Sequence, residues 1–340
     1  MKVSVVIVAE EVNDYVRENI GWQIKQEFQD FEILLILSKE TSEVFPKTRV
    51  IVRPDLAGNP AQRRDLSIVE AQGEILAFID DDAYPSNLWL ASAWRHFEDI
   101  KIGAVGGPGV TPPEDSWRQK VSGWVQASPM GGSLLTFFRF RPITGRREVD
   151  DYPSMNLLVR KSDFAMIGGF DSNFYPGEDT KLCLDLTQKL GKKIIYDPEV
   201  LVYHHRRPIF KGHLRQIGGY GLHRGFFART LPQTSRRIIY FMPPSLVVFL
   251  FFTPLLAWTF KIFNFQFSSA DWQINFQFLL PAYFLILTTY FLLLLLNSIW
   301  VFGKTKDFKV SFWLLPAVFL THLWYGIQFL RGIISRKLTR

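Results

Sequence analysis

The chain has 340 residues, of which 48% are hydrophobic and 21% are charged. This apolar content suffices for a large core and excludes general disorder, while the single cysteine excludes an intramolecular disulfide and CxxC-type zinc or iron–sulfur sites. The net charge of +7 is uneven, because residues 204–237 carry eight Lys and Arg without an acid and residues 1–203 carry −7. The basic residues adjoin very apolar segments, so we expect a membrane surface as partner and no nucleic acid.

The first 200 residues alternate between predicted strands and helices. The N-terminal apolar run is too short for a signal peptide, so we expect the N-terminal domain to be cytosolic. The alternation predicts an α/β fold with an open, mostly parallel sheet covered by helices on both faces. Residues 108–150, rich in Pro, Gly and charge, are predicted to be irregular. Strands are expected at 3–9, 32–37, 49–52, 75–79, 155–159 and 194–204, and helices at 12–28, 61–71, 88–97 and 179–190.

The last third predicts a membrane domain over residues 236–340. Three nearly uncharged stretches, at about 241–263, 278–302 and 310–330, are long enough to cross a bilayer. Lys and Arg residues lie before the first stretch and after the second, whereas residues 264–275, between these two stretches, contain none. Because positive charge favours the cytosolic side, the first two stretches are expected to form a hairpin with both ends in the cytosol. A third span would put the basic tail outside, whereas a re-entrant or in-plane helix would not. We therefore expect two to three transmembrane helices, and length alone favours three.

The first candidate site is the acidic triplet Asp80, Asp81 and Asp82, which follows a predicted buried strand. Ligands of open α/β sheets bind at the carboxyl ends of strands, and hard carboxylate ligands favour Mg²⁺ or Mn²⁺. A solvated acidic turn is an equally simple interpretation of the triplet taken alone.

The second candidate site is the Gly177-Glu178-Asp179 step at the start of a predicted helix. Asp179 is either a helix cap or a general base with Glu178 beside it. Downstream, His204 is a metal ligand or an ordinary histidine at a strand end. Arg215 and Arg224 are candidates for gripping a diphosphate because guanidinium groups match phosphate oxygens. The basic residues at 229, 236 and 237 are better explained as facing the membrane.

Several well-known signatures are missing from the sequence. It contains no GxxxxGK[ST] phosphate loop, no HExxH, no GxSxG and no GxGxxG after the first strand. These absences argue against the commonest nucleoside triphosphatases, zinc proteases, serine hydrolases and dinucleotide-dependent enzymes.

Taken together, the motifs resemble family 2 glycosyltransferases of the GT-A fold over about residues 1–235. The matching segments are the Val-Ser-Val-Val-Ile-Val strand, residues 58–65, residues 71–82 ending in the acidic triplet, Gly-Gly-Phe-Asp at 168–171 and Gly-Glu-Asp at 177–179. Residues 203–207, 213–216, 220–225 and 322–326 resemble the membrane-attached branch similar to succinoglycan-type exopolysaccharide glycosyltransferases. This resemblance implies a Rossmann-like GT-A domain over 1–235 followed by the membrane domain.

The resemblance also implies roles for residues. Asp82 binds the metal, Asp80 or Asp81 helps to hold metal or ribose, and Asp179 is the base, with Glu178 beside it. Arg64, Arg215 and Arg224 contact the nucleotide-sugar donor substrate, and His204 is a further candidate metal ligand. Many members have an Asp after the second strand, where this chain reads Leu37-Ser38-Lys39-Glu40. Glu10 or Glu11, after the first strand, is expected to supply that nucleotide contact instead.

The expected function is inverting, metal-dependent sugar transfer from a nucleoside-diphosphate sugar to a hydroxyl of a polyprenyl-diphosphate-linked glycan. The enzyme would serve cell-surface or extracellular polysaccharide synthesis at a bacterial-type inner membrane, in contact with membrane lipids. The alternatives are a polyprenyl-phosphate sugar synthase and a non-catalytic membrane scaffold that retains the fold. A polymerising synthase is a weaker alternative because Gly219 and Tyr220 stand where a Gln-x-x-Arg-Trp motif needs Arg and Trp.

Overall fold

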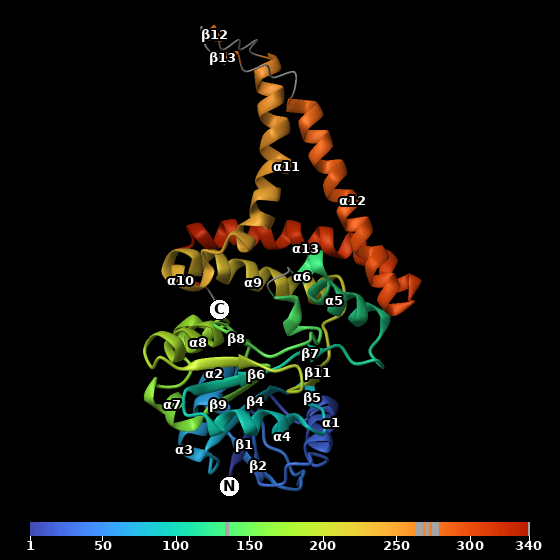
Figure 1. Cartoon of the computed structure of the whole chain (residues 1–340). Helices are drawn as coiled ribbons and strands as arrows, with labels where there is room; N and C mark the ends of the chain where they lie inside the picture. Colours follow the sequence, from blue (N-terminus) through green and yellow to red (C-terminus); the bar gives the residue numbers. More distant parts are fainter. Residues whose placement is uncertain (133–135, 263–267, 270–271, 274–278, 339–340) are drawn as a thin grey trace. The chain divides into compact units, whose positions relative to one another are not determined.

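The computed structural model describes residues 1–132, 136–262, 268–269, 272–273 and 279–338, the side chains at 257, 260–262, 268–269, 272–273 and 279 excepted. The chain forms two compact units (Figure 1). The first comprises Met1–Asp115 and Leu135–Arg206, and the second comprises Ser116–Leu134 and Arg207–Thr339. Residues 207–235, which the sequence analysis counts with the first domain, therefore group with the apolar helices.

The first unit is built on an eight-stranded sheet in the order β3-β2-β1-β4-β9-β6-β10-β8. Six of the strands run in one direction, and β9 and β8 run against their neighbours, so the sheet is mostly parallel as predicted. A smaller sheet has the order β5-β11-β7. The strands are β1 Val3–Ala9, β2 Phe31–Leu37, β3 Thr48–Val52, β4 Ile75–Asp80, β5 Ala83–Pro85, β6 Ile102–Gly106, β7 Gly109–Val110, β8 Arg147–Val149, β9 Asn156–Arg160, β10 Lys193–Tyr196 and β11 Val202–His204.

The central strands are buried on both faces, which explains their continuous apolar sequences. Alternate residues of β1 enter separate cores, since Val5 and Ile7 pack on one face and Val6 and Val8 on the other. Helices and 3₁₀ turns cover these faces (Figure 1). They are α1 Asp14–Gln23, η1 Pro54–Leu56, α2 Pro60–Asp65, α3 Ser67–Glu70, α4 Trp89–Trp94, η2 Arg95–Glu98, η3 Phe137–Arg139, α7 Lys161–Met166, η4 Ser172–Phe174 and α8 Glu178–Gln188.

Two predicted elements are divided in the structure. The helix expected over 61–71 breaks into α2 and α3 at Leu66. The strand expected over 194–204 becomes β10 in the large sheet and β11 in the small one. Pro198, between them, has no N–H to donate to a strand ladder, and Asp197 turns the chain by accepting a hydrogen bond from the Glu199 N–H at 2.9 Å. This division carries the end of β11 to the acidic triplet.

The prediction that residues 108–150 are irregular is wrong for their first half. Helix α5 spans Trp117–Ala127 and belongs to the second unit. Ser116 accepts a hydrogen bond from the Gln119 N–H, while the Gln119 side chain accepts one from the Ser116 N–H, which is a reciprocal capping box. The segment also contains the short helix α6 Pro129–Gly132, the turn η3 and strand β8.

The second unit is mostly helical. Its remaining elements are α9 Lys211–Thr230, α10 Pro232–Ser235, α11 Ile238–Ile262, β12 Ser268–Ser269, β13 Trp272–Gln273, α12 Leu279–Thr305 and α13 Phe308–Ile334. Helices α11, α12 and α13 are long and apolar enough to cross a membrane. Within this unit α13 runs crosswise to α11 and α12 and alongside α9 (Figure 1). The predicted external connection at 264–275 lies outside the described residues, except for β12 and β13.

Candidate functional site

The acidic triplet lies where two sheets of the first unit meet. Asp80 ends β4, Asp82 precedes β5, and β5 pairs with β11 so that Ala83 lies opposite His204. The His205 N–H donates to the Asp82 carbonyl oxygen at 2.9 Å. This pairing brings His204 to the acids although more than 120 residues of chain separate them.

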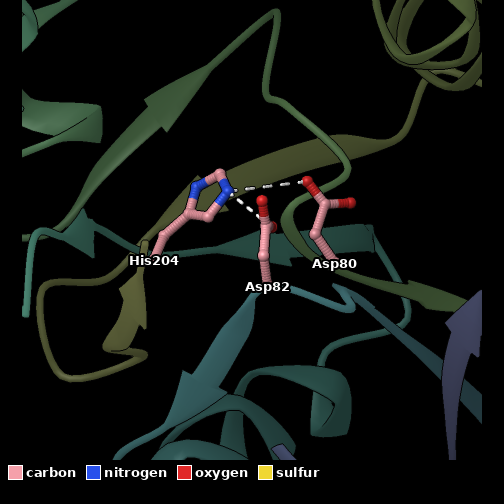
Figure 2. A group of neighbouring side chains, drawn as sticks. All are labelled: Asp80, Asp82 and His204. Atoms are coloured by element: carbon pink, nitrogen blue, oxygen red, sulfur yellow. Dashed lines mark ion pairs between the residues drawn. The ribbon is translucent and has the colours of Figure 1, made fainter. Parts of the chain in front are cut away.

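Asp80, Asp82 and His204 form a group that fits a divalent cation (Figure 2). His204 Nε2 lies 2.9 Å from Asp82 Oδ1 and 4.0 Å from Asp80 Oδ2, and the three ligand atoms lie within 4.8 Å of one another. Two carboxylates and an imidazole are suitable ligands for Mn²⁺, and the carboxylates alone suit Mg²⁺. The sequence predicted these three residues as metal ligands, and the structure brings them together.

The histidine fits a metal only in one tautomer. Its Nδ1 lies 3.0 Å from Arg206 Nη1 and 3.1 Å from Met155 Sδ. A guanidinium only donates, so beside Arg206 the ring proton of neutral His204 belongs on Nε2, where it is donated to Asp82. Coordination through Nε2 requires this proton to move to Nδ1, where the Met155 thioether is a weak acceptor. The two carboxylates therefore fit a cation as they stand, whereas His204 fits only after a tautomer change that breaks its hydrogen bond from Arg206.

Arg64 connects the acidic triplet to the start of α8. Its Nη2 donates to Asp80 Oδ1 at 2.8 Å, and its Nη1 donates to Glu178 Oε1 at 3.2 Å. The side chain is only 10% exposed, so both ion pairs are shielded from solvent. The sequence predicted that Arg64 contacts the nucleotide-sugar donor substrate. In the structure, the described contacts of Arg64 are with two carboxylates of the site, which it holds in fixed positions.

Glu178 and Asp179 form the first turn of α8, where carboxylates are favoured by the helix dipole. Asp179 Oδ1 accepts a hydrogen bond from the Thr180 N–H at 2.7 Å. Burial of Glu178, together with the negative charge of Asp179, raises its pKa to about 7 in spite of the neighbouring Arg64. A glutamate that titrates near neutrality beside a second carboxylate is typical of acid–base sites.

Asp65, to which the sequence analysis gave no role, positions the Gly-Gly-Phe-Asp loop. Gly168 and Gly169 have φ of +84° and +79°, which favours glycine, and a side chain on Gly169 would collide with Asp65. Asp65 Oδ1 accepts the Phe170 N–H at 2.7 Å. Burial raises the pKa of Asp65 to about 7. The only signal in the sequence was that Asp65 directly follows Arg64 in the matching segment 58–65.

A second group of polar residues lies at the end of β1. Glu10 forms an ion pair with Arg63 at 2.5 Å, and its Oε1 accepts the Gly58 N–H at 3.3 Å. Glu11 instead pairs with Lys39 at 2.7 Å. Because Glu10 is 53% exposed, it remains accessible to a ligand. Glu11, the other glutamate that the sequence offered as a nucleotide contact, is 56% exposed and equally accessible.

The three-ligand group does not include the remaining predicted residues. Asp81 is not among its ligands, and burial, with the charges of Asp82 and Asp80, raises the Asp81 pKa to about 6. Arg215 and Arg224 lie on α9 of the second unit. Arg224 contacts the Ser235 hydroxyl at 3.4 Å and lies 4.8 Å from the Tyr240 ring centroid.

The chain is 28% identical over 162 residues to the pre-mycofactocin glycosyltransferases of two Mycobacterium tuberculosis strains, CDC 1551 / Oshkosh and ATCC 25618 / H37Rv. The match covers 48% of this chain but only 33% of the length of each relative.

Among solved structures, mannosyltransferase PcManGT from Pyrobaculum calidifontis, in complex with GDP-Man and Mn²⁺, has a TM-score of 0.55 at 15% identity. The similarity covers 99% of this chain and 88% of that one and shows that the two share the GT-A fold. The model of glycosyl transferase family group 2 matches residues 75–304, which is more than half of the chain. The chain therefore belongs to glycosyl transferase family group 2.

Proposed function

We propose that the chain transfers a sugar, with inversion, from a nucleoside-diphosphate sugar to a hydroxyl of a membrane-bound acceptor. The observation that carries this proposal is Arg64, which joins the Asp80 carboxylate to Glu178 at the start of α8. One buried side chain thus links a candidate metal ligand to the residue beside the candidate base, Asp179. The relative of known structure holds a sugar nucleotide with Mn²⁺, which supports the same donor class here.

The metal would be held by Asp80 and Asp82, with His204 as a third ligand after the tautomer change. When bound, Mg²⁺ or Mn²⁺ neutralises negative charge on the diphosphate of the donor. Glu10 and Asp81 are proposed to contact the nucleotide. Arg215 and Arg224 remain predictions for the diphosphate because they lie on the second unit.

Asp179 is the proposed base. It accepts the proton of the acceptor hydroxyl as that oxygen bonds to the anomeric carbon, while the bond from this carbon to the diphosphate breaks on the opposite side. The Thr180 N–H fixes one oxygen of the Asp179 carboxylate. Glu178 is fixed by Arg64 and is proposed as a positioning residue for Asp179.

The acceptor is proposed to be a polyprenyl-diphosphate-linked glycan, since α11 and α12 fit a membrane anchor. Holding the site at the surface where such an acceptor is confined raises its effective concentration. We place the catalytic unit in the cytosol of a bacterial-type cell, at the inner membrane, because basic residues flank the α11–α12 hairpin. Its product would enter cell-surface or extracellular polysaccharide.

The test is nucleoside-diphosphate release by the detergent-solubilised full chain with a panel of UDP- and GDP-sugars and membrane lipid extract. We expect release with one donor, present with Mn²⁺ and lost with chelator. Asp179→Asn should lower turnover by about 10²- to 10⁴-fold and leave donor affinity in calorimetry unchanged. The matched control is Asp185→Asn on the same helix, because Asp185 pairs only with lysines in the described contacts.

The outcomes separate the alternatives. A lipid phosphate acceptor is already anionic, so a polyprenyl-phosphate sugar synthase would keep most of its turnover after Asp179→Asn. A scaffold would neither bind a donor in the presence of metal nor release a nucleoside diphosphate. Either result would contradict the proposed role of Asp179.

A further inference from the structure

Helices α9 and α13 are in backbone contact along much of their length. A Cβ atom added to Gly221 of α9 would lie 2.6 Å from a carbonyl oxygen of α13, and one added to Gly225 would also collide with an α13 carbonyl. Gly332 of α13 faces a carbonyl of α9 in the same way. A hydrogen bond of 2.9 Å joins His213 of α9 to Thr321 of α13. The two helices therefore occupy the same depth relative to a membrane.

The charges of α9 indicate that this depth is the membrane surface rather than the bilayer interior. Helix α9 carries four Lys and Arg among its 20 residues, at 211, 215, 224 and 229. Each charge at the centre of a bilayer costs about 3 kcal/mol or more, so α9 does not lie in the hydrocarbon. Helix α13 is fixed to α9, while α11 and α12 leave the pair crosswise (Figure 1). Any surface between α9 and α13 is thus at the level of lipid headgroups.

A groove of about 540 Å³ lies between these two helices. Lys211, Arg215 and Leu222 line it from one face of α9, and Trp324 and Gln328 line it from α13. The Trp324 indole packs over Gly218, where any Cβ would collide with its Nε1. Lys211 and Arg215 are exposed, and no hydrogen bond or ion pair joins either to another described residue. The groove therefore presents two cations and an indole N–H.

No acidic group in the described part of the chain pairs with the two charges in this groove. Lys211 and Arg215 lie one helical turn apart, a spacing at which like charges repel. The sequence of the whole second unit contains sixteen Lys and Arg against two acids, Asp271 and Asp307. Asp307 caps α13 by accepting the Val310 N–H at 3.0 Å. An anion bound between the two cations would relieve their repulsion, and phosphate oxygens suit both donors.

We propose that the α9–α13 groove binds the phosphate of an anionic membrane lipid. Lys211 and Arg215 would hold the phosphate oxygens, and Trp324 would add a donor while its ring contacts the upper acyl chain. The site goes beyond the proposed sugar transfer and needs neither donor nor acceptor. Donor diphosphate and lipid phosphate are alternative ligands for Arg215, and an experiment without donor tests the lipid alone.

The experiment is native mass spectrometry of the full chain in detergent, titrated with phosphatidylglycerol or with phosphatidylcholine of identical acyl chains. We expect the first phosphatidylglycerol to bind about tenfold more tightly than phosphatidylcholine, because both lipids carry the same phosphodiester but the cationic choline of phosphatidylcholine is repelled by Lys211 and Arg215. The double variant Lys211→Gln/Arg215→Gln should lose this preference. Trp324→Phe, which keeps an aromatic ring over Gly218, should weaken it. The matched control Arg336→Gln/Lys337→Gln removes the same charge elsewhere in the unit and should keep it.

Three results would overturn the proposal. The two lipids could bind equally to the unmodified chain, or the control variant could lose as much preference as the groove variant. Inorganic phosphate could also displace phosphatidylglycerol at equal concentration, which would indicate a simple anion site. Thermal unfolding of each variant verifies that it is folded. Since the readout is lipid binding, failure here leaves the donor-release test of the proposed function unaffected.

Discussion

Arg64 holds two carboxylates of the site at once, and both of its ion pairs are shielded from solvent. Replacing it with Met would leave Asp80 and Glu178 without their cation in a largely buried setting. We expect Arg64→Met to lower the free energy of unfolding by about 3 kcal/mol, measured by denaturant unfolding in detergent.

The matched control for this change is Arg53→Met. Arg53 pairs with Asp55 at 2.6 Å, but both side chains are exposed, so the loss should stay below about 1 kcal/mol. Equal losses for the two variants would mean that Arg64 does not hold the site together.

Asp65 makes the stability of the first unit depend on pH. Burial raises the pKa of Asp65 to about 7, above its ordinary value of 3.8, so the folded state binds the proton more tightly than the unfolded state does. Its ionisation therefore destabilises the fold progressively as pH rises from about 4 to about 7. Asp65→Asn retains an acceptor for the Phe170 N–H and removes this effect.

We expect Asp65→Asn to gain melting temperature over the unmodified chain between pH 5 and pH 8, reaching roughly 2–4 °C at pH 8. The measurement is thermal unfolding of both proteins across that range. A difference in melting temperature that does not change with pH would show that Asp65 ionises normally in the folded state.

At the residue scale, the sequence indicated the carboxylates that could bind a metal or act as a base, but it did not indicate which contacts hold the site in place. Asp80, Asp82 and Asp179 were visible because carboxylates that follow a buried strand or begin a helix are typical of ligand sites in α/β folds. The pairing of Arg64 with Glu178 joins residues 114 positions apart, and that of Asp65 with Phe170 joins residues 105 apart. Such pairs depend on the completed fold, so no local pattern indicates them.

At the element scale, the contact between α9 and α13 depends on glycines that have no room for a side chain. Gly225→Ala would place a methyl group against a carbonyl oxygen of α13 and force the helices apart. We expect a lower melting temperature for this variant in detergent, although Ala is the better helix former.

Gly219→Ala is the matched control, on the same helix. A Cβ at Gly219 meets no atom within 4 Å, so the change should be neutral or add up to about 1 kcal/mol of stability. If Gly225→Ala raised the melting temperature as much as Gly219→Ala, the close approach of α9 and α13 would be refuted.

Strands and helices could be predicted from the sequence where complete burial requires an unbroken run of apolar residues. Strands β1 and β2 are entirely buried, so their continuous apolar runs marked them clearly. Helix α5 was missed because its sequence is mixed and lies among Pro, Gly and charged residues. Its Ser116-x-x-Gln119 capping box was the available signal. The division of 194–204 between two sheets depends on pairing partners, which a single apolar run does not specify.

At the scale of the whole molecule, charge and packing lead to the same membrane topology. The second unit has three apolar helices, but one of them is fixed to the cationic helix α9. The apolar length of α13 alone favoured a third span. Its contact with α9 favours an in-plane position, which also leaves the basic tail on the side of the catalytic unit. We therefore expect two crossings, by α11 and α12.

Cysteine labelling tests this topology directly because the only native cysteine, Cys183, is fully buried and adds little background. Single cysteines at Glu40, Ser269 and Lys337 would report the catalytic unit, the α11–α12 connection and the tail. With two crossings, a membrane-impermeant maleimide labels Glu40→Cys and Lys337→Cys in inverted vesicles of the expression host, and Ser269→Cys only in intact spheroplasts. With a third span, Lys337→Cys would label together with Ser269→Cys, and α9 could not then remain at the surface while in backbone contact with α13.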